Sequence, residues 1–259
     1  MKILSWNVNG LRAVYKRNFL QWSEEVDADV ICLQEIKIQR PQLPSDLINL
    51  KNYQSYFSFA VKKGYSGVAV YTKEKPIKVE PKLNLQRFDS EGRILRLDYS
   101  DFLLINLYLP HGGRQKENLV YKLEVYDLLL NYLEKIKNKN VILIGDFNIA
   151  REEIDLARPK QNQKNIMFTP EERGKIDRII ELGFTDSFRK FYKDGGHYTW
   201  WPYYLKARER NLGWRIDYVF VSKPLSKKVK NSFILKNVYG SDHCPVGIEL
   251  TKRRVLTAG

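Results

Sequence analysis

Acids, amides and one histidine stand beside short apolar runs at widely separated points of the sequence. A side chain at the end of a strand is held by the rigid sheet, so strand ends suit groups that need a fixed position. Taken singly, each has an ordinary explanation: Asp and Asn beside Gly are common in turns, Glu35 could be a surface acid and His243 a core imidazole. Their number favours a functional site, and the residues are Asn7, Asn9, Glu35, Asp146, Asn148, Asp217, Asp242 and His243.

Carboxylates with amide oxygens and no thiolate make an oxygen-rich site, which suits Mg²⁺ or Mn²⁺ and not zinc. Asp217 as a partner of His243 would fix the protonation state and tautomer of the imidazole. These parts predict hydrolysis of a phosphate ester. The metal neutralises phosphate oxygens, a carboxylate activates water, and a cationic imidazole stabilises the charge that builds up on the phosphorus centre.

The elements that hold these residues are predicted from periodicity. A helix over about 117–137 is predicted by the three- and four-residue spacing of Leu119, Leu123, Tyr126, Leu130 and Leu133. Pro170 and Gly183 bound a second helix over about 170–182. Strands mixed with helices indicate an α/β fold, with two packed sheets faced by helices, and nothing divides the chain, so we expect one domain over 1–259. The predicted strands are 3–4, 30–33, 67–71, 103–109, 141–144, 218–221 and 246–250.

Composition excludes several classes of protein. The 259 residues are 43% hydrophobic and 13% aromatic, which excludes a disordered chain. No apolar run approaches the roughly 20 residues that span a bilayer, and the first residues lack the pattern of a signal peptide. With Cys32 and Cys244 as the only cysteines, we expect a cytoplasmic protein that acts at the nucleoid, is not secreted and does not engage a membrane.

The net charge of +14 and the pI near 9.6 point to a polyanionic partner, of which nucleic acid is the commonest in the cytosol. The alternative is a charge-rich surface that only keeps the protein dispersed. Clustering of the basic residues favours a binding face. The clusters are Lys206, Arg208 and Arg210; Lys223, Lys227, Lys228 and Lys230; and Lys252, Arg253 and Arg254.

Six motifs occur in an order that resembles the exonuclease III type of apurinic/apyrimidinic (AP) endonuclease, within the endonuclease/exonuclease/phosphatase superfamily. They are WNVNGLR (6–12), LQEIK (33–37), GYSGVA (64–69), GDFN (145–148), WRIDY (214–218) and GSDHCP (240–245). The resemblance runs from Lys2 to about Leu250 and includes segments 153–156 and 162–165. It implies a four-layer α/β sandwich, two β-sheets packed face to face with helices outside.

The resemblance also implies roles for the site residues. Glu35 would be the principal ligand of Mg²⁺, for which Mn²⁺ could substitute. Asp146 would activate the attacking water or handle the proton of the leaving group, and Asn148 would orient water and phosphate. His243, held by Asp217, would contact the scissile phosphate. The further residues implied in or beside the metal shell are Asn7, Asn9, Asp146, Asn148, Asp242 and His243.

Two positions leave alternatives open. Tyr108 would hydrogen-bond the phosphate or act as a phenolate, whereas the following Pro110 also suits an aromatic residue on an edge strand. Asn9 stands where some members of the family carry Asp. A neutral ligand attracts Mg²⁺ less than a carboxylate does, so we expect weaker or differently balanced metal binding.

Substrate selection is predicted to involve the aromatic residues between the basic clusters, a combination suited to nucleic acid. Tyr198 and Trp201 are expected in the core instead. By resemblance, Trp200, Trp214 and Ile216 would wall a pocket for an extrahelical abasic sugar, which is cheap to extrude because it has lost its base. Arg114 and Tyr204 would enter the DNA grooves. Phosphate or sugar contacts are expected from Lys37, Asn162, Asn165 and Arg215, with solvated surface roles open for Lys37 and Arg215.

The function expected from these residues is a Mg²⁺-dependent monomeric nuclease acting on double-stranded DNA with abasic sites or blocked 3′ ends. It would cut 5′ of the abasic site and leave a 3′-hydroxyl, with 3′-5′ exonuclease and 3′-phosphodiesterase activities in addition. One alternative is another superfamily phosphoesterase or a nonspecific DNase. A second is a catalytically silent DNA-binding protein, against which the intact site residues argue.

Overall fold

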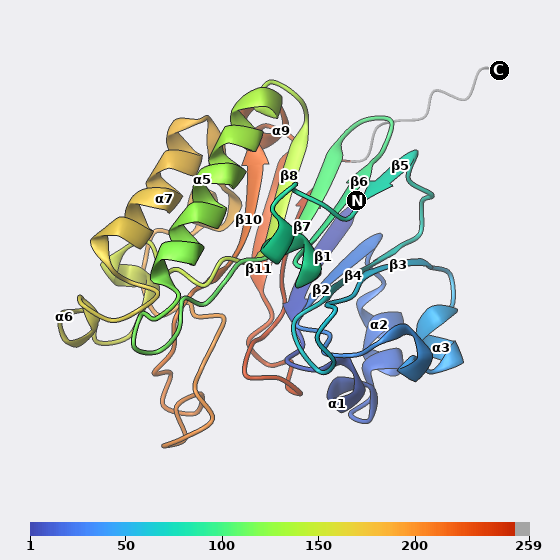
Figure 1. Cartoon of the computed structure of the whole chain (residues 1–259), viewed down its shortest axis with the longest axis horizontal. Coiled ribbons are helices and arrows are strands. Elements are labelled where there is room, and N and C mark those ends of the chain that lie inside the picture. Colours follow the sequence, from blue (N-terminus) through green and yellow to red (C-terminus); the bar gives the residue numbers. More distant parts are fainter. Residues whose placement is uncertain (252–259) are drawn as a thin grey trace.

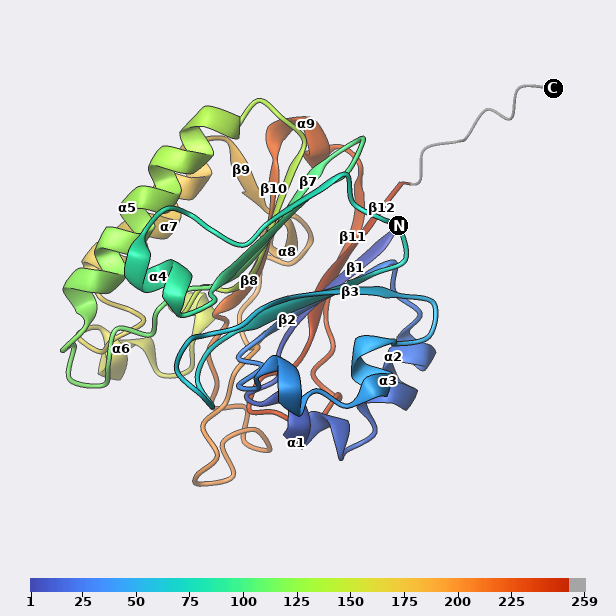
Figure 2. The same ribbon diagram turned by 45° about the vertical axis from the view of Figure 1, so that its right-hand side comes forward.

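The computed structural model describes residues 1–251, and in them two mixed six-stranded sheets pack face to face with helices on their outer faces (Figure 1). This confirms the predicted four-layer α/β sandwich. Figure 2 separates the layers, with α5 and α7 outside one sheet and α1, α2 and α3 outside the other. The basic cluster at 252–254 lies outside the described residues.

The first sheet has the order β11-β12-β1-β2-β4-β3, with β1 and β2 parallel to each other. Its first and last strands in the chain are neighbours, since β1 pairs antiparallel with β12. The strands are β1 (Lys2–Asn7), β2 (Val30–Gln34), β3 (Gln54–Ser58), β4 (Val68–Thr72), β11 (Val229–Ile234) and β12 (Val246–Leu250).

The second sheet repeats this arrangement in the order β5-β6-β7-β8-β10-β9, with β7 and β8 as its parallel pair. Its strands are β5 (Lys78–Glu80), β6 (Ile94–Asp98), β7 (Leu103–Tyr108), β8 (Val141–Asp146), β9 (Phe184–Asp186) and β10 (Asp217–Ser222). All seven predicted strands are confirmed. The short or partly polar strands β3, β5, β6, β9 and β11 were not predicted.

Helices fill the connections between the strands. The α-helices are α1 (Leu11–Tyr15), α2 (Phe19–Val26), α3 (Ser45–Ile48), α4 (Gln86–Ser90), α5 (Leu119–Ile136), α6 (Pro159–Asn162), α7 (Pro170–Glu181), α8 (Ser187–Phe191) and α9 (Lys223–Ser226). Two 3₁₀ turns, η1 (Arg40–Gln42) and η2 (Glu153–Asp155), complete this set within residues 1–251. Both predicted helices are confirmed, α7 with Pro170 in its first turn and Thr169 as its N-cap.

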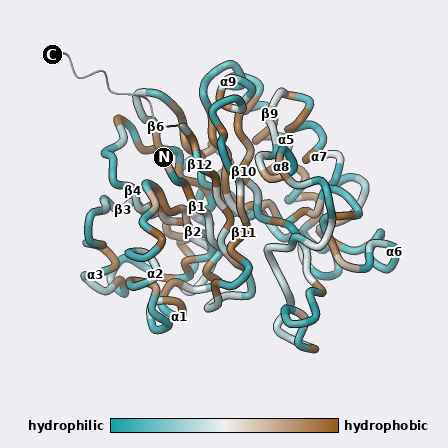
Figure 3. The backbone as a smooth tube through the Cα atoms, turned by 180° about the vertical axis from the view of Figure 1, so that it is seen from behind, coloured by the Kyte–Doolittle hydropathy of each residue, from teal (hydrophilic) through white to brown (hydrophobic). Residues whose placement is uncertain are grey.

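Strand alternation builds separate cores on the two faces of each sheet, because successive side chains of a strand point to opposite faces. In β8, Ile142 and Ile144 face the first sheet, whereas Val141 and Leu143 face α5. Hydrophobic residues therefore concentrate in the central strands (Figure 3). Each fully buried side chain of this size contributes about 1.5–3 kcal/mol, so these layers fix how the two sheets sit on each other.

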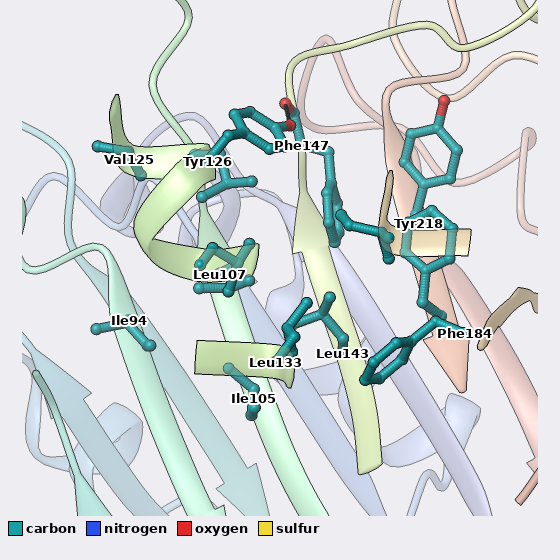
Figure 4. Packing of buried hydrophobic residues seen from close by; sticks show 14 of the residues in the cluster. Ile94, Ile105, Leu107, Val125, Tyr126, Leu133, Leu143, Phe147, Phe184 and Tyr218 are labelled. Atoms are coloured by element: carbon teal, nitrogen blue, oxygen red, sulfur yellow. Dashed lines mark hydrogen bonds between the residues drawn. The ribbon is translucent and has the colours of Figure 1, made fainter. Parts of the chain in front are cut away.

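The face of α5 that packs on the sheet differs from the predicted one. The periodicity predicted a stripe that included Leu123 and Leu130, but both are only partly buried. The helix instead turns Val125, Leu129 and Leu133 onto the sheet, and Figure 4 shows Val125 and Leu133 over the strand residues. Three successive leucines at 128–130 make the buried face ambiguous from periodicity alone.

Candidate active site

The candidate active site forms where the apolar core between the two sheets ends. Asn7, Tyr108, Asp146 and Asp217 occupy one end of β1, β7, β8 and β10, and each has the strand parity that faces the opposite sheet. We call this the site end of the sandwich, and the opposite end, with Lys2, Val141 and Ser222, the far end. Polar side chains replace apolar ones at the site end, so sequence position and parity together determine the site.

Three of the predicted site residues converge on one point. Glu35, Asp146 and His243 each offer a ligand atom, and these atoms lie within 4.8 Å of one another. Asn7 fixes the two carboxylates, since its Nδ2 donates to Glu35 Oε1 at 2.8 Å and to Asp146 Oδ2 at 2.8 Å. Oxygen donors beside one imidazole suit a hard divalent cation such as Mg²⁺ or Mn²⁺, so this donor set fits the predicted metal.

His243 and Asp217 form a buried pair at the same point. Nδ1 of His243 lies 2.9 Å from Asp217 Oδ2, and its Nε2 lies 4.0 Å from Asp146 Oδ2. Burial alone would lower the pKa of His243, but the Asp217 carboxylate outweighs it and raises that pKa to about 10. The imidazole is therefore protonated at neutral pH, and Nε2–H points its donor toward the cluster.

The pKa of Asp146 is raised, whereas the pKa of a hydrogen-bonded carboxylate is usually lowered. Burial raises the pKa of Asp146 to about 8, and the negative charge of Asp217, its direct partner in the β8–β10 register, adds to the rise. The carboxylate is held in place by the backbone N–H of Asn148, which donates to Oδ1 at 2.8 Å. The amide group of Asn148 donates to Leu109 O at 2.9 Å. In the metal-free protein, Asp146 thus has proton affinity near that of a general base.

A hydrogen-bonded chain runs from this cluster toward the aromatic residues. Lys37 forms an ion pair with Glu35 at 2.8 Å and donates to Asn9 Oδ1. Asn9 Nδ2 donates to Asp242 Oδ1 at 2.9 Å, and Trp200 Nε1 donates to Asp242 Oδ2 at 3.0 Å. Asn9 and Asp242 therefore border the cluster. The Lys37 side chain is 32% exposed, with its ammonium group paired within this hydrogen-bonded chain.

The same hydrogen-bonded chain also determines the charge of two carboxylates. Burial would raise the pKa of Glu35, but the Lys37 ammonium and the Asn7 hydrogen bond outweigh it and lower that pKa. Asp242 behaves in the same way, since His243, Asn9 and Trp200 overcome its burial and lower its pKa. Both groups are thus anionic at neutral pH, which favours a cation at the site.

Tyr108 lies on the third strand of its sheet and is buried, so the edge-strand alternative is wrong. Burial raises the pKa of Tyr108 well above its usual value, with Glu35 and Asp146 acting in the same direction and Arg93 opposing them. The Arg93 guanidinium lies 4.4 Å from the centre of the Tyr108 ring. The neutral hydroxyl is therefore the favoured form over the phenolate.

The predicted aromatic wall assembles beside His243. Ile216 is buried in a small apolar cluster against which Trp200 and Trp214 pack. Trp200 forms isolated β-bridges with both Trp214 and His243, so the wall and the catalytic candidates share one backbone framework. Tyr198 and Trp201 are buried in the core, as expected.

Arg215 was wrongly assigned to a DNA contact or a solvated surface. Its side chain is only 1% exposed, with Nε donating to Asp155 Oδ1 at 2.7 Å and Nη2 donating to Asp186 Oδ2 at 2.8 Å. Arg189 pairs with the same Asp155. Since a buried charge is stable only when paired, Arg215 is part of the structural support behind the aromatic wall.

The other predicted DNA-contacting residues lie outside the metal cluster, on loops or, for Asn162, at the end of α6. Arg114 and Tyr204 are exposed. Asn165 donates from Nδ2 to Asn162 Oδ1 at 2.8 Å, and Asn162 donates to Arg158 O at 2.9 Å, so the two asparagines stabilise the turn around α6.

The two described basic clusters lie at opposite ends of the sandwich. Arg208 donates to Ser241 O at 3.1 Å, which places the cluster of residues 206–210 beside Asp242 at the site end. Lys223 follows Ser222, the last residue of β10, whereas Asp217 is its first. At about 3.3 Å per residue, the lysines of α9 and β11 are roughly 17 Å or more from the site. Clustering alone therefore did not identify one binding face.

Sequence reasoning missed a buried ion pair beneath the site loops. Lys122 Nζ donates to Glu172 Oε1 at 2.5 Å, Asn148 O at 2.7 Å and His111 O at 3.1 Å, and both charged side chains are fully buried. Lys122 thus joins the loops that follow β7 and β8. Two signals could have found it: Lys122 interrupts an apolar helical face, and Thr169 with Glu172 has the spacing of a capping box.

Comparison with known proteins decides the family. A model of the Endonuclease/Exonuclease/phosphatase family matches residues 4–243. The chain belongs to this family. Within the endonuclease/exonuclease/phosphatase family, it is similar to an exodeoxyribonuclease of Bacillus subtilis (strain 168), with 45% identity over 249 residues that cover 95% of this chain and 98% of the relative.

Two further relatives identify the same group of enzymes. The DNA repair nuclease APEX1 of Danio rerio is 42% identical over 255 residues, covering 96% of this chain and 82% of that protein. The structure of an AP endonuclease from Archaeoglobus fulgidus superposes with a TM-score of 0.88 at 30% identity, covering 96% of this chain and 99% of that one. The chain is thus a hydrolase of the exodeoxyribonuclease and AP endonuclease group.

Within residues 1–251, none of the helices combines the length and the apolar character that crossing a bilayer requires.

Proposed function

We propose that this enzyme is a Mg²⁺-dependent DNA repair nuclease that hydrolyses the phosphodiester bond 5′ of an abasic site and leaves a 3′-hydroxyl. We further propose 3′-5′ exonuclease and 3′-phosphodiesterase activities on blocked 3′ ends. The observation that carries the proposal is the convergence of Glu35, Asp146 and His243 within 4.8 Å, beside the aromatic wall.

The metal would be held principally by Glu35, with Asp146 and Asp242 as further carboxylates around it and Asn7, Asn9 and Asn148 completing or bordering its shell. His243 would border that shell as a protonated donor, because an imidazolium has no free lone pair for a metal. When bound, Mg²⁺ neutralises phosphate oxygens and so lowers the cost of attack by water. Mn²⁺ prefers the same ligands and would substitute for it. Asn7 keeps the carboxyl groups of Glu35 and Asp146 close together by donating to both.

The reaction needs a group that accepts a proton from water. Asp146 takes this role because its carboxylate lies in the cluster with Glu35 and His243, and Asn148 N–H and Asn7 hold its orientation. As the water oxygen bonds to phosphorus, the P–O3′ bond breaks and the departing O3′ takes a proton from solvent. The products are a 3′-hydroxyl on one side of the cut and a 5′-phosphate on the abasic sugar.

Negative charge on the phosphate oxygens grows during this attack, and two hydrogen-bond donors stabilise it. His243 is cationic because of Asp217, so its Nε2–H stabilises an anion more strongly than a neutral donor does. Tyr108 adds a neutral hydroxyl. Asn148 orients the water and the phosphate.

The abasic sugar would be bound against Trp200, Trp214 and Ile216, where a small apolar wall accepts a sugar without a base more readily than a whole nucleotide. Arg114 and Tyr204 are exposed on loops and would enter the grooves of double-stranded DNA. Asn162, Asn165 and Lys37 would contact phosphate or the extruded sugar.

The substrate is tested with a panel of defined duplexes in Mg²⁺ and in excess chelator. We expect cutting of an abasic duplex in Mg²⁺, none in chelator, and little cutting of the same duplex with a normal base at that position. Hydrolysis of inositol polyphosphates instead would assign the protein to another branch of the superfamily. Equal cutting of damaged and normal duplexes would make it a nonspecific DNase.

The site is tested with Asp146→Asn and His243→Asn, which keep the size of the side chains. Each variant should lower kcat by about 100-fold or more, as expected for a lost general base or transition-state donor, while DNA retention on a filter stays near that of the wild type. The matched control is His197→Asn, which breaks an exposed His–Asp pair with Asp194. Wild-type cutting by either site variant would refute these roles.

We also propose that residues 1–259 form one catalytic domain that acts as a monomer in the cytoplasm. The family match over residues 4–243 supports the first point. Cys32 and Cys244 are buried free thiols, which suits a reducing compartment.

A further inference from the structure

Thr199 is a fully buried residue outside the metal cluster, between the aromatic wall and the Asp217–His243 pair. We infer that Thr199 is a positioning residue that sets the distance between Asp217 and His243. The inference rests on the proposed function, in which that pair presents a cationic donor to phosphate.

The side chain of Thr199 holds the start of β10. Its Oγ1 accepts hydrogen bonds from the backbone N–H of Ile216 and of Asp217, each at 3.1 Å. Its own hydroxyl hydrogen faces Trp214 O at 3.4 Å. A hydroxyl has two acceptor positions and one donor position, so the Thr199 hydroxyl uses its full hydrogen-bonding capacity.

The main chain of Thr199 holds the other member of the pair. Its carbonyl accepts a hydrogen bond at 2.8 Å from the N–H of Cys244, the residue that directly follows His243. Its N–H donates to Trp214 O at 2.9 Å. One residue therefore fixes the backbone next to His243 and, through its hydroxyl, the backbone of Asp217.

This link matters because the pair spans the two sheets. Asp217 begins β10 in the second sheet, whereas His243 precedes β12 in the first sheet. A small shift of one sheet against the other changes the 2.9 Å contact between His243 Nδ1 and Asp217 Oδ2. Since a catalytic group misplaced by about 1 Å can cost roughly 100-fold in rate, a residue that ties both backbones controls turnover without touching substrate.

The test uses Thr199→Val and Thr199→Ala, which remove the hydroxyl with and without its volume, and Thr199→Ser, which keeps it. On an abasic duplex we expect kcat to fall about tenfold to 100-fold in the first two variants, with KM changed less than about threefold, and to recover in Thr199→Ser. In a crystal structure of Thr199→Val, the His243 Nδ1–Asp217 Oδ2 distance should exceed about 3.5 Å, beyond a hydrogen bond.

The matched control is Thr72→Val, because Thr72 is equally buried at the far end, where its hydroxyl donates to Glu74 O and accepts from Tyr99. It should lose stability as the Thr199 variants do but keep its kcat. A kcat of Thr199→Val and Thr199→Ala no lower than that of Thr72→Val, or no recovery in Thr199→Ser, would overturn the inference. If the wild type leaves abasic DNA uncut, the proposed function fails instead, and the crystal structure alone decides the inference: a contact kept at about 2.9 Å in Thr199→Val overturns it.

Discussion

The two ends of the sandwich are built from the same strands but differ in chemistry. At the site end, the space between the sheets closes with hydrogen-bonded polar groups: beneath Asp146, Gln34 Nε2 donates to Asn106 Oδ1 at 2.6 Å, joining the two sheets. At the far end, the same space opens into a cavity of about 670 Å³. Its lining includes Val30, Tyr99, Phe102, Leu225 and Leu250, with Lys227 and Lys228 among its charged residues.

The comparison teaches that strand direction, and not charge, locates the chemistry. The parallel pairs β1–β2 and β7–β8 both direct their carboxyl ends to the site end, where their last residues meet across the sheets. The far end carries a cluster of four lysines against three basic residues at the site end, yet it lacks a convergent set of acids and a histidine within residues 1–251. The following predictions test whether catalysis and DNA binding depend on the site end and not on the far end.

The largest effect is expected at the site end from Asp217→Asn. The variant leaves His243 without its negative partner, so the imidazole loses the charge and orientation that the phosphate needs, and we expect kcat to fall about 1000-fold. Single-turnover cutting of an abasic duplex measures it. Asp194→Asn, in the exposed pair with His197, is the control and should cut normally. Similar losses in both variants would show that the effect is not specific to the site.

Next in size is the buried ion pair between α5 and α7. Lys122→Met leaves Glu172 charged and buried without its partner, which should lower the free energy of unfolding by about 3–5 kcal/mol. The same helices carry a more exposed pair, Lys175 with Asp127 at 2.6 Å, and Lys175→Met should cost less than about 1 kcal/mol. Urea unfolding measures both. Equal costs would contradict the view that the site loops depend on the buried pair.

A pH-dependent effect should follow from His243. Its pKa is raised from 6.5 to about 10, so the folded protein holds the proton more tightly than the unfolded chain. This contribution to stability is complete below about pH 6.5 and is lost as the pH rises through about 10. In chelator, the stability advantage of the wild type over His243→Asn should therefore shrink from about pH 6 to about pH 10 when followed by urea unfolding. An advantage that grew with pH would contradict the assignment.

The smallest effect is expected at the far end. Reversing Lys227 and Lys228 to Glu should leave retention of abasic DNA within about twofold, because these side chains are remote from the site. The matched change near the site, Lys206→Glu with Arg210→Glu, should weaken retention and flatten its salt dependence by about 0.9 per lost phosphate contact. Titrations at several salt concentrations compare them. Equal losses would break the division between the two ends.

The sequence predicted the central strands well because those strands are buried on both faces and read as continuous apolar runs. Edge and near-edge strands such as β5, β9 and β11 mix polar with apolar residues, and their pairing depends on neighbours that are remote in the chain. The same limit explains the misjudged face of α5, where local periodicity allowed two registers and packing on the sheet selected one.

The site could be predicted in outline because its residues are unusual at strand ends. Glu35 and His243 lie 208 positions apart in the sequence, and the structure brings them together. Arg215 shows the limit of such reasoning, since a basic residue in a DNA-binding motif looked like a phosphate contact until its burial against Asp155 and Asp186 was known. Lys122 and Thr199 were missed because their importance lies in long-range contacts of an ordinary side chain.

The pairing of β1 with β12 has a consequence for biosynthesis. Lys2 lies opposite Glu249, so β1 gains its neighbour on that side only after residue 249 has been translated. His243 precedes β12 by three residues and is therefore translated just before it. A product truncated before His243 would carry Glu35 and Asn7 but neither the imidazole nor the β12 neighbour of β1, so we expect it to be inactive.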